Sequence, residues 1–593
     1  MATTIHRSPA TGRDAVGDEA DGPSAAPRSR RRDGDSGPLG IGRPPAAVWL
    51  AALLLGLVGA LWSVAQPHYR APDEAAHVDL VLHLAEGNPY PSFDGRRFGE
   101  EIGLDDDRYL VDLAIPWPRF DEADAPPRSG RPDVDDLGGT TPDDNARRLG
   151  PDGSARAGYP YVYNQMPQHP PLYYEAMATV LRVERWLLPG DGLPSLDREI
   201  GLLRLANVLL LVPLPLLAWA VVRRLGGDDR AGMVAAVLPL CVPQLTHLGA
   251  AVNNDNLFAL VGAGLAVLLA GVARGRRTRA TDVGVGVLLG LALLTKAFAA
   301  MFVPWVVIAY LVGWRTTRER RPAVPLAVAG VVALAVGGWW WLANWVREGE
   351  PAPTTENLTR TTADRPDGFS PDRLSYAWTF AGRMVTRTWA WVGFGTPKFD
   401  LPVALVALTA GAILVATLVA LRHARPGLRR APDDGLRRID VALAWLPVVL
   451  LVAFVFRRAW GLFETTGRFA FVQGRYLFGV GAAPAAVAAI GAVRLHRRAG
   501  VAAVGLAVVL QGWMLADVVR GSWSGDGPLG ALDGVLAWSP WPAAAVVAVA
   551  GAAAAVTVVL AVAVWRSPAA QPSPTKPSGG PIGESVSGAG SSA

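Results

Sequence analysis

Two adjacent carboxylates and a histidine directly follow the first apolar segment of the chain. Asp73 and Glu74 come after Pro72, and His77 lies four residues beyond Asp73, which is one helical turn if a helix begins near the proline. A carboxylate shielded from bulk water can take a proton from an attacking hydroxyl, so Asp73 is a candidate general base. Glu74 or His77 would orient it or bind a substrate hydroxyl. The alternative is that the two carboxylates only favour a helix N-terminus through its macrodipole.

A second polar cluster opens another candidate helix, in the stretch Gln168-His169-Pro170-Pro171-Leu172-Tyr173-Tyr174. His169 and the tyrosine rings, Tyr173 among them, could line a ligand pocket, where aromatic faces and a few polar groups are typical. The other interpretation is structural: the prolines start a helix and the tyrosines anchor it at a membrane surface.

A third cluster, Asn253-Asn254-Asp255-Asn256, separates two apolar segments. Asp255 together with Asp73 could hold a hard divalent cation through carboxylate oxygens, or Asp255 could position an acceptor molecule. A short polar turn needs such residues in any case, so the stretch is equally typical of a turn.

Two basic residues stand out from the arginines of the loops. Lys296 ends Leu294-Thr295-Lys296 in a chain that otherwise uses arginine almost everywhere, and an ammonium is a suitable point charge for a phosphate, although its default role is to snorkel to the membrane surface. Arg475, followed by Tyr476 in Gln473-Gly474-Arg475-Tyr476, falls just inside an apolar segment, where an unpaired charge is expensive. We therefore expect Arg475 to have a partner or a ligand, and we predict that Tyr476 lines the same site.

Composition indicates the elements that must position these residues. Of 593 residues 51% are hydrophobic and only 18% are charged, against roughly 25% in soluble proteins. Many apolar runs reach the ~20 residues that cross a bilayer. The sequence predicts an all-α polytopic integral membrane protein of about twelve transmembrane helices, near 46–66, 201–222, 231–250, 254–273, 282–295, 299–314, 323–345, 402–421, 439–456, 472–493, 500–519 and 540–565. The net charge is +5, but most of the basic residues lie in short loops between these segments, which argues against nucleic acid as a partner. The single cysteine, Cys241, excludes disulfides within the chain.

The loop arginines also predict orientation, because positive charges in short loops tend to stay cytoplasmic. They place both termini in the cytoplasm, provided that the stretch 170–188, with four charged residues, is a juxtamembrane amphipathic helix that does not cross the membrane.

This orientation divides the chain into seven expected segments. They are a disordered tail (1–45), the first transmembrane helix (46–66), a large extracytoplasmic loop with juxtamembrane helices and an acidic insertion at about 94–158 (67–200), transmembrane helices 2–7 (201–345), an extracytoplasmic loop with an interfacial helix at 376–395 (346–400), transmembrane helices 8–12 (401–565) and a second disordered tail (566–593). All the clusters above then fall on the outer side.

In this order the motifs Pro72-Asp73-Glu74-Ala75-Ala76-His77, His169-Pro170-Pro171-Leu172-Tyr173-Tyr174, Asn254-Asp255, Leu294-Thr295-Lys296 and Gln473-Gly474-Arg475-Tyr476 resemble the GT-C glycosyltransferases. The resemblance is closest to a bacterial domain-of-unknown-function family of polytopic membrane proteins in that superfamily, and covers about residues 46–495. It implies transfer of a sugar from a polyprenyl-phosphate carrier to an acceptor at the outer face, with inversion. Asp73 would match the acidic position that activates the acceptor and Asp255 the second acidic position. The resemblance carries over no role for Lys296 or Arg475.

The expected partners are therefore a polyprenyl-phosphate-linked sugar, the lipid bilayer and an envelope glycan, glycolipid or protein as acceptor, in the plasma membrane of a bacterium. A divalent cation stays open as a cofactor. Two alternatives are a transporter or flippase of lipid-linked sugars and a non-catalytic scaffold with the same fold. Transport needs polar residues deep within the membrane segments, and the predicted segments carry their charges at the ends, which favours the enzyme.

Overall fold

The computed structural model describes residues 41–68, 70–91, 165–188, 196–318, 322–354, 368–393, 398–428, 435–523 and 529–567. Residues 44–593 form one compact unit, to which all the helices below belong, and residues 1–43 form another. The acidic insertion at 94–158 and nearly all of the two predicted disordered tails lie outside the described residues. Within the described part the regular structure is helical, and the remaining pairings are two isolated bridges, Val392 with Phe399 and Arg425 with Arg437.

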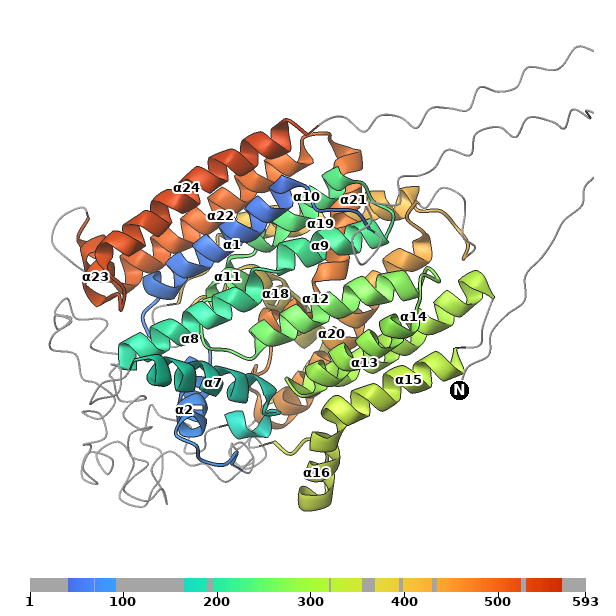
Figure 1. The fold of residues 1–593 in the computed structure, drawn as a ribbon, viewed down its shortest axis with the longest axis horizontal. Helices are drawn as coiled ribbons and strands as arrows, with labels where there is room; N and C mark the ends of the chain where they lie inside the picture. Colours follow the sequence, from blue (N-terminus) through green and yellow to red (C-terminus); the bar gives the residue numbers. More distant parts are fainter. Residues whose placement is uncertain are drawn as a thin grey trace, which may run out of the picture. The chain divides into compact units, whose positions relative to one another are not determined.

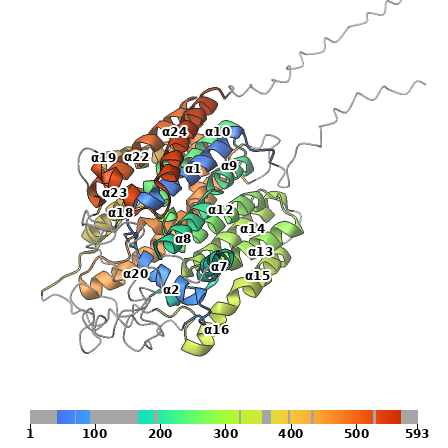
Figure 2. The same ribbon diagram turned by 60° about the vertical axis from the view of Figure 1, so that its left-hand side comes forward.

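Nine helices of the described residues are long and apolar enough to cross a membrane. Three of them consist of two or more labelled pieces, because a proline or a short change of helix type interrupts the α-helix. They are α1 (Ala46–Ala65), α8 with α9 (Leu196–Leu211, Leu214–Arg224), α12 (Asp255–Val272), η5 with α14 (Ala297–Met301, Phe302–Thr317), α15 with η6 and α16 (Ala323–Ala333, Leu334–Gly338, Trp339–Glu348), α19 (Val403–His423), α20 (Arg438–Thr466), α22 (Ala499–Ser522) and α24 (Ala543–Trp565). Figures 1 and 2 show α1, α22 and α24 side by side along one flank of this unit.

Two further apolar segments are bent rather than straight. The helix α10 (Asp229–Val237) continues through η4 (Leu238–Cys241) and turns by 69° into α11 (Pro243–Gly249), and η7 (Gly474–Val480) meets α21 (Ala482–Leu495) at 79°. A proline at position 243 cannot continue the preceding helix, which accounts for the first break. Counting each bent pair as one span gives up to eleven in the described residues. The one remaining predicted span, 282–295, corresponds to α13 (Arg279–Leu293). Its 15 residues reach only about 22 Å, which is too short to cross a bilayer. The predicted number of about twelve is therefore not confirmed.

The remaining helices are too short to cross a bilayer: α2 (Glu74–Ala85), η3 (Met166–Gln168), α7 (Leu172–Leu187), α18 (Arg373–Trp389) and α23 (Gly530–Trp538). The first three lie together at one end of the helical bundle, where α2 packs on α7 (Figure 1). Fully buried side chains such as Leu80, Leu84, Tyr173 and Leu181 form the core of this cap. Both α7 and α18 fall in stretches where the sequence predicts helices that lie along the membrane surface.

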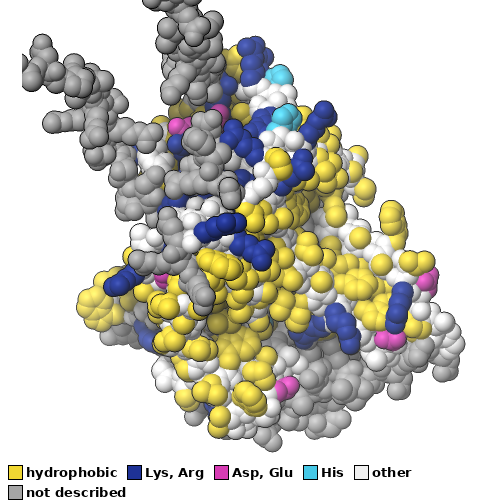
Figure 3. All heavy atoms as spheres, turned by 90° about the vertical axis from the view of Figure 1, so that its right-hand side faces the viewer, with side chains coloured by type: hydrophobic (Ala, Val, Ile, Leu, Met, Phe, Trp, Pro, Cys, Tyr) yellow, Lys and Arg dark blue, Asp and Glu magenta, His cyan; other side chains and the backbone are white. Residues whose placement is uncertain are grey.

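Large apolar side chains cover the outside of the bundle. Val324 is 73% exposed, Val403 72% and Val558 63%, on three different helices. Figure 3 shows one face, where hydrophobic side chains form a broad zone and Lys and Arg gather beyond it. A water-soluble protein would not leave so large an apolar surface open, whereas a lipid environment matches it. The chain is thus a multi-pass, all-α membrane protein.

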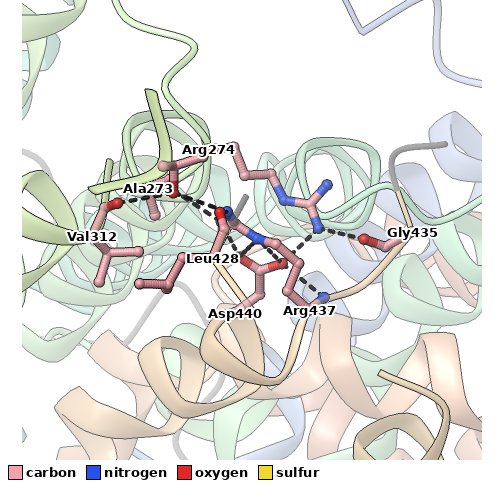
Figure 4. Close-up of polar contacts among 8 residues, drawn as sticks. Ala273, Arg274, Val312, Leu428, Gly435, Arg437 and Asp440 are labelled. Carbon is pink, nitrogen blue, oxygen red and sulfur yellow. Dashed lines mark hydrogen bonds and ion pairs between the residues drawn. The ribbon is translucent and has the colours of Figure 1, made fainter. Parts of the chain in front are cut away.

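An ion cluster joins three of the arginine-rich loops (Figure 4). Asp440, on α20, accepts hydrogen bonds from Arg274 at 2.6 Å and from Arg437 at 2.6 Å. Arg437 also donates to the carbonyl of Ala273 at the end of α12 and to the hydroxyl of Thr316 at the end of α14. These loops, which the arginine count predicts to be cytoplasmic, therefore meet at one end of the bundle. Asp255 begins α12 about 27 Å away, at the other end.

Candidate functional site

Asp73 stands between α1 and α2 in an unusual backbone conformation. It precedes the first residue of α2 with φ at 64°, in the left-handed region. Among the described residues other than glycine, only Arg318 and Phe471 share this sign of φ, and Phe471 lines the same cavity as Asp73. Such conformations cost free energy and cluster at functional sites, because the surrounding structure must hold them.

A buried ion pair fixes the loop that carries Asp73. Glu74 and Arg204 are both 0% exposed, and the guanidinium binds both carboxylate oxygens, at 2.8 and 2.7 Å. The other donors of Arg204 reach the carbonyls of Ser63, Gln66 and Pro67 at the end of α1. All five N–H groups of Arg204 are thus occupied. Glu74 also accepts from the backbone N–H of Val252, so its side chain points into the helix packing and not into the cavity.

Four charged side chains from distant parts of the sequence form an alternating chain next to this loop. Arg475 donates through Nη2 to Oδ2 of Asp73 at 2.5 Å, and Lys296 donates to Oδ1 of Asp255 at 2.5 Å. Nε of Arg475 lies 3.8 Å from Oδ2 of Asp255, and neither atom has a hydrogen-bond partner among the described residues. We call Asp73, Arg475, Asp255 and Lys296 the four-charge chain; its formal charge is zero.

Amides complete the polar surroundings of the four-charge chain. Gln165 donates to the second carboxylate oxygen of Asp73 at 3.3 Å, and Asn253 donates to the carbonyl of Pro72 at 3.2 Å. Asn253 also accepts from the backbone N–H of Asp255, while Asn254 lies 3.5 Å from Nζ of Lys296. The stretch Asn253–Asn256 therefore contacts both ends of the four-charge chain, near Asp73 and at Lys296.

Close helix packing brings Arg475 to this position. The helix η7 lies against α12, where Gly262 faces the carbonyl of Gly479 with no room for a Cβ atom. Gly474 likewise packs onto the backbone of α18 at Arg387 and Thr388. Within this packing the side chain of Arg475 is 6% exposed and points toward Asp73.

The four-charge chain borders a cavity of about 180 Å³. Polar groups line one part of it: Asp73, His77, Gln165, Gln168, His169, Asn253, Asn254, Lys296, Arg458, Gln473 and Arg475. Aromatic rings line another part, where Phe298 packs edge-on against Tyr476 at 4.8 Å and against Phe454 at 5.9 Å between centroids. Nζ of Lys296 lies 5.3 Å from the rings of Phe298 and Tyr476. The cavity therefore offers charge on one side and an aromatic surface on the other.

Both histidines of the motifs line the cavity and are held neutral. Burial lowers the pKa of His77 well below its usual value, and the charges of Arg475 and Lys296 lower it further. Burial and Lys296 likewise lower the pKa of His169. Tyr90 donates to the carbonyl of His169 at 2.8 Å, which fixes that residue at the cavity wall.

The two tyrosines of the second motif have different surroundings. Tyr173 is fully buried away from the cavity wall, and its hydroxyl donates to Asn207 at 2.9 Å. Tyr174 instead reaches His77, with its hydroxyl 3.0 Å from Nδ1. Asp255 also lies one layer behind the cavity surface, covered by Lys296 and Arg475. The structure thus brings Asp73, His77, His169, Lys296, Arg475 and Tyr476 to the cavity, and leaves Glu74, Tyr173 and Asp255 behind it.

The two carboxylates that the sequence offers for a divalent cation are already paired with protein cations. Among the described residues there is no group of three or more His, Cys, Asp or Glu side chains that could hold a metal ion. Asp73 and Asp255, the two carboxylates that the sequence offers for a cation, each already face a protein cation at 2.5 Å. A metal ion between them would have to displace both Lys296 and Arg475.

All of these motifs lie within a known family. The family model described as Predicted membrane protein (DUF2142) matches residues 55–482. The chain belongs to this family. The match confirms the predicted membership of a membrane-protein family with a domain of unknown function, and it contains every residue of the four-charge chain.

Comparison with solved structures finds similar chains at low identity. One is ArnT from Cupriavidus metallidurans bound to undecaprenyl phosphate, at 16% identity and a TM-score of 0.41, covering 86% of this chain and 76% of that one. Another is the oligosaccharyltransferase of Archaeoglobus fulgidus tethered with an acceptor peptide, at 15% identity and a TM-score of 0.26, covering 67% of this chain and 47% of that one. No curated protein matches the sequence.

Proposed function

We propose that this protein is a GT-C-type glycosyltransferase that transfers a sugar from a polyprenyl-phosphate donor to an envelope glycan, glycolipid or protein at the outer face of the bacterial plasma membrane. The observation that carries the proposal is the meeting of five sequence-distant motifs at one cavity. Asp73, the cations Lys296 and Arg475, and two neutral histidines line the cavity beside its aromatic wall. Acid–base groups, phosphate ligands and a surface for an apolar or sugar group are what this reaction requires.

Asp73 acts as the general base. The acceptor hydroxyl attacks the anomeric carbon of the donor sugar, the bond from that carbon to the phosphate oxygen breaks, and the acceptor proton passes to the Asp73 carboxylate. Attack from the face opposite the phosphate inverts the configuration. Lys296 and Arg475 stabilise the charge that develops on the leaving phosphate.

Phosphate binding and base activation are coupled in this site. Arg475 and Gln165 occupy both oxygens of Asp73, and Lys296 is bound to Asp255. A phosphate that binds the guanidinium of Arg475 competes for it with the carboxylate of Asp73. When it draws Arg475 away, an oxygen of Asp73 becomes free to accept the acceptor proton.

The polyprenyl chain leaves the site over the aromatic wall. Phe454, on this wall, is 38% exposed on α20, which packs against α14, where Val303 is 42% exposed. A chain attached to a phosphate at Lys296 would pass these side chains into the lipid. Glu74 has a positioning role in this scheme, since its carboxylate is bonded to Arg204 behind the cavity.

The test compares the lipid-linked sugars of the parent bacterium, a strain lacking this protein, and strains carrying either Asp73→Asn or Asp533→Asn in its place. We expect a polyprenyl-phosphate sugar to accumulate in the deletion and Asp73→Asn strains but not in the Asp533→Asn strain. Asp533 is exposed on α23, so the same chemical change there controls for the substitution itself. Unchanged lipid-linked sugars and envelope carbohydrate in the deletion strain would reject the proposal, whereas accumulation in the deletion strain alone would remove Asp73 from it.

A further inference from the structure

We propose that Tyr174 is a positioning residue that holds His77 with its proton on Nε2, so that His77 offers a neutral N–H donor to an oxygen of the bound ligand. The identity of that ligand rests on the proposed function. The tautomer of His77 does not, because it follows from contacts within the chain alone.

The contact between the two side chains carries the proposal. The hydroxyl of Tyr174 lies 3.0 Å from Nδ1 of His77, and the two rings are nearly parallel, at 18° and 5.7 Å between centroids. Tyr174 is 0% exposed and His77 2%, so water does not compete for this hydrogen bond. A buried bond of this kind determines which ring nitrogen of a histidine carries the proton.

The single hydroxyl proton of Tyr174 has two acceptors within reach. One is Nδ1 of His77, and the other is the sulfur of Met166 at 3.3 Å. A thioether is a weak acceptor, whereas the unprotonated nitrogen of an imidazole is a good one. The phenol therefore donates to Nδ1, and the imidazole proton must reside on Nε2.

The position of the proton on the imidazole ring decides which hydrogen bonds His77 can make. With Nδ1 occupied, Nε2 is the nitrogen left for the cavity that His77 lines. In this tautomer Nε2 donates, so it pairs with a hydroxyl or phosphate oxygen and cannot accept a proton. In the opposite tautomer, Nδ1 would donate to the phenol, the phenol would donate to Met166, and Nε2 would face the cavity as a base. The neutral charge of His77, which its lowered pKa maintains at pH 7, leaves the charge of the site to Lys296 and Arg475.

Nitrogen NMR of the full-length protein in lipid nanodiscs, labelled with ¹⁵N at histidine, measures the tautomer directly. The signal that disappears in the His77→Gln variant is that of His77. We expect the Nε2–H tautomer in the native protein and a mixture of both tautomers in Tyr174→Phe. Tyr173→Phe is the matched control, since the neighbouring hydroxyl bonds Asn207, and it should leave the His77 signal unchanged. Met166→Leu should also leave it unchanged. The Nδ1–H tautomer in the native protein, or a native tautomer in Tyr174→Phe, would overturn the proposal.

Kinetics supply a second readout once donor turnover is measurable. Loss of one hydrogen bond of ordinary strength should lower kcat/KM for the donor by about fivefold in Tyr174→Phe. On a His77→Gln background the same substitution should have little further effect, because the two residues act as one unit. Full additivity of the two losses would show that Tyr174 does not act through His77. A protein that transfers no sugar but keeps the Nε2–H tautomer would reject the proposed function and leave this inference standing.

Discussion

Asp73 binds two protein donors at once, and this defines what its substitution should do. Asp73→Asn keeps the size of the side chain and an oxygen for Gln165, but removes the charge that pairs with Arg475 and the group that accepts a proton. We expect turnover to fall by about 10²- to 10⁴-fold, the usual contribution of a general base. The folded fraction, measured by size exclusion in detergent, should stay above that of Glu74→Gln, because Asp73 is 21% exposed and Arg475 keeps Asp255 nearby. Near-native turnover in well-folded Asp73→Asn would remove the base from this position.

Lys296 and Arg475 should bind the donor phosphate. Lys296→Met and Arg475→Gln should each lower affinity for a polyprenyl phosphate by about ten- to a hundredfold, since charge-assisted hydrogen bonds contribute ~1.5–3 kcal/mol. Arg475→Lys should be impaired too, because an ammonium cannot make two parallel contacts. Isothermal titration in nanodiscs measures the affinity.

The ion pairs require a control for stability in that experiment. Lys296→Met leaves Asp255 buried without its cation, so a loss of binding could follow from a damaged fold. The double variant Lys296→Met with Asp255→Asn removes both charges and should recover thermal stability while donor binding stays weak. Recovery of binding along with stability would exclude Lys296 as a phosphate ligand.

Glu74 should matter for folding. Glu74→Gln leaves Arg204 charged at 0% exposure with a neutral partner, and breaking a buried ion pair of this kind typically costs about 3–5 kcal/mol. Thermal unfolding in detergent should show a clear fall in melting temperature. Glu175→Gln, which alters an exposed pair with Arg182, should change stability by no more than about 0.5 kcal/mol. Equal melting temperatures for the two variants would contradict the anchoring role of Glu74.

For single residues, the amino-acid type predicts which side chains reach the cavity, but it does not predict which of them form ion pairs with one another. Six of the residues singled out in the sequence line the cavity together. Their ion pairs could not be predicted, since Arg475 and Asp73 lie 402 positions apart. Arg204 was missed although it carries a signal: it is a charge four residues into a predicted apolar span, which normally requires a partner.

Among the elements, the bent helices matter most for the site, because η7 carries Arg475 and α11 leads into the stretch that holds Asn253 and Asn254. Apolar composition predicts spans at 231–250 and 472–493 but not that these segments break, since hydropathy does not report direction. Pro243 was the available signal for the first break. For η7, no residue of the segment gives a comparable signal. Its position depends on the contact between Gly479 and Gly262 of α12, which forms only in the folded chain.

That contact gives a prediction at the scale of elements. Gly262→Ala adds a methyl group where the carbonyl of Gly479 lies, so η7 must move away from α12 and take Arg475 with it. We expect both a lower melting temperature and weaker polyprenyl phosphate binding. Gly505→Ala, in a helix where a Cβ atom meets nothing within 4 Å, should be neutral or stabilising. Native affinity in Gly262→Ala would mean that η7 does not depend on this packing.

At the scale of the whole molecule, the arginine count predicts which ends of the helices face the cytoplasm. Cysteine introduced at exposed Ser375 should react with an impermeant thiol reagent in intact cells, whereas cysteine at exposed Arg279 should react only after lysis. The native Cys241 is buried and provides little background. The reverse pattern of labelling would invert the orientation and place the cavity in the cytoplasm.

The left-handed backbone of Asp73 has a consequence for how this protein can be studied by mutagenesis. Asparagine and aspartate tolerate φ near 64°, whereas alanine adopts it only at a cost of about 1 kcal/mol or more. An alanine scan would therefore combine two losses at position 73, one chemical and one conformational, and would exaggerate the role of the carboxylate. Glycine and asparagine separate them: Asp73→Gly relaxes the backbone, Asp73→Asn preserves the side-chain shape, and only a defect common to both reports on the carboxylate itself.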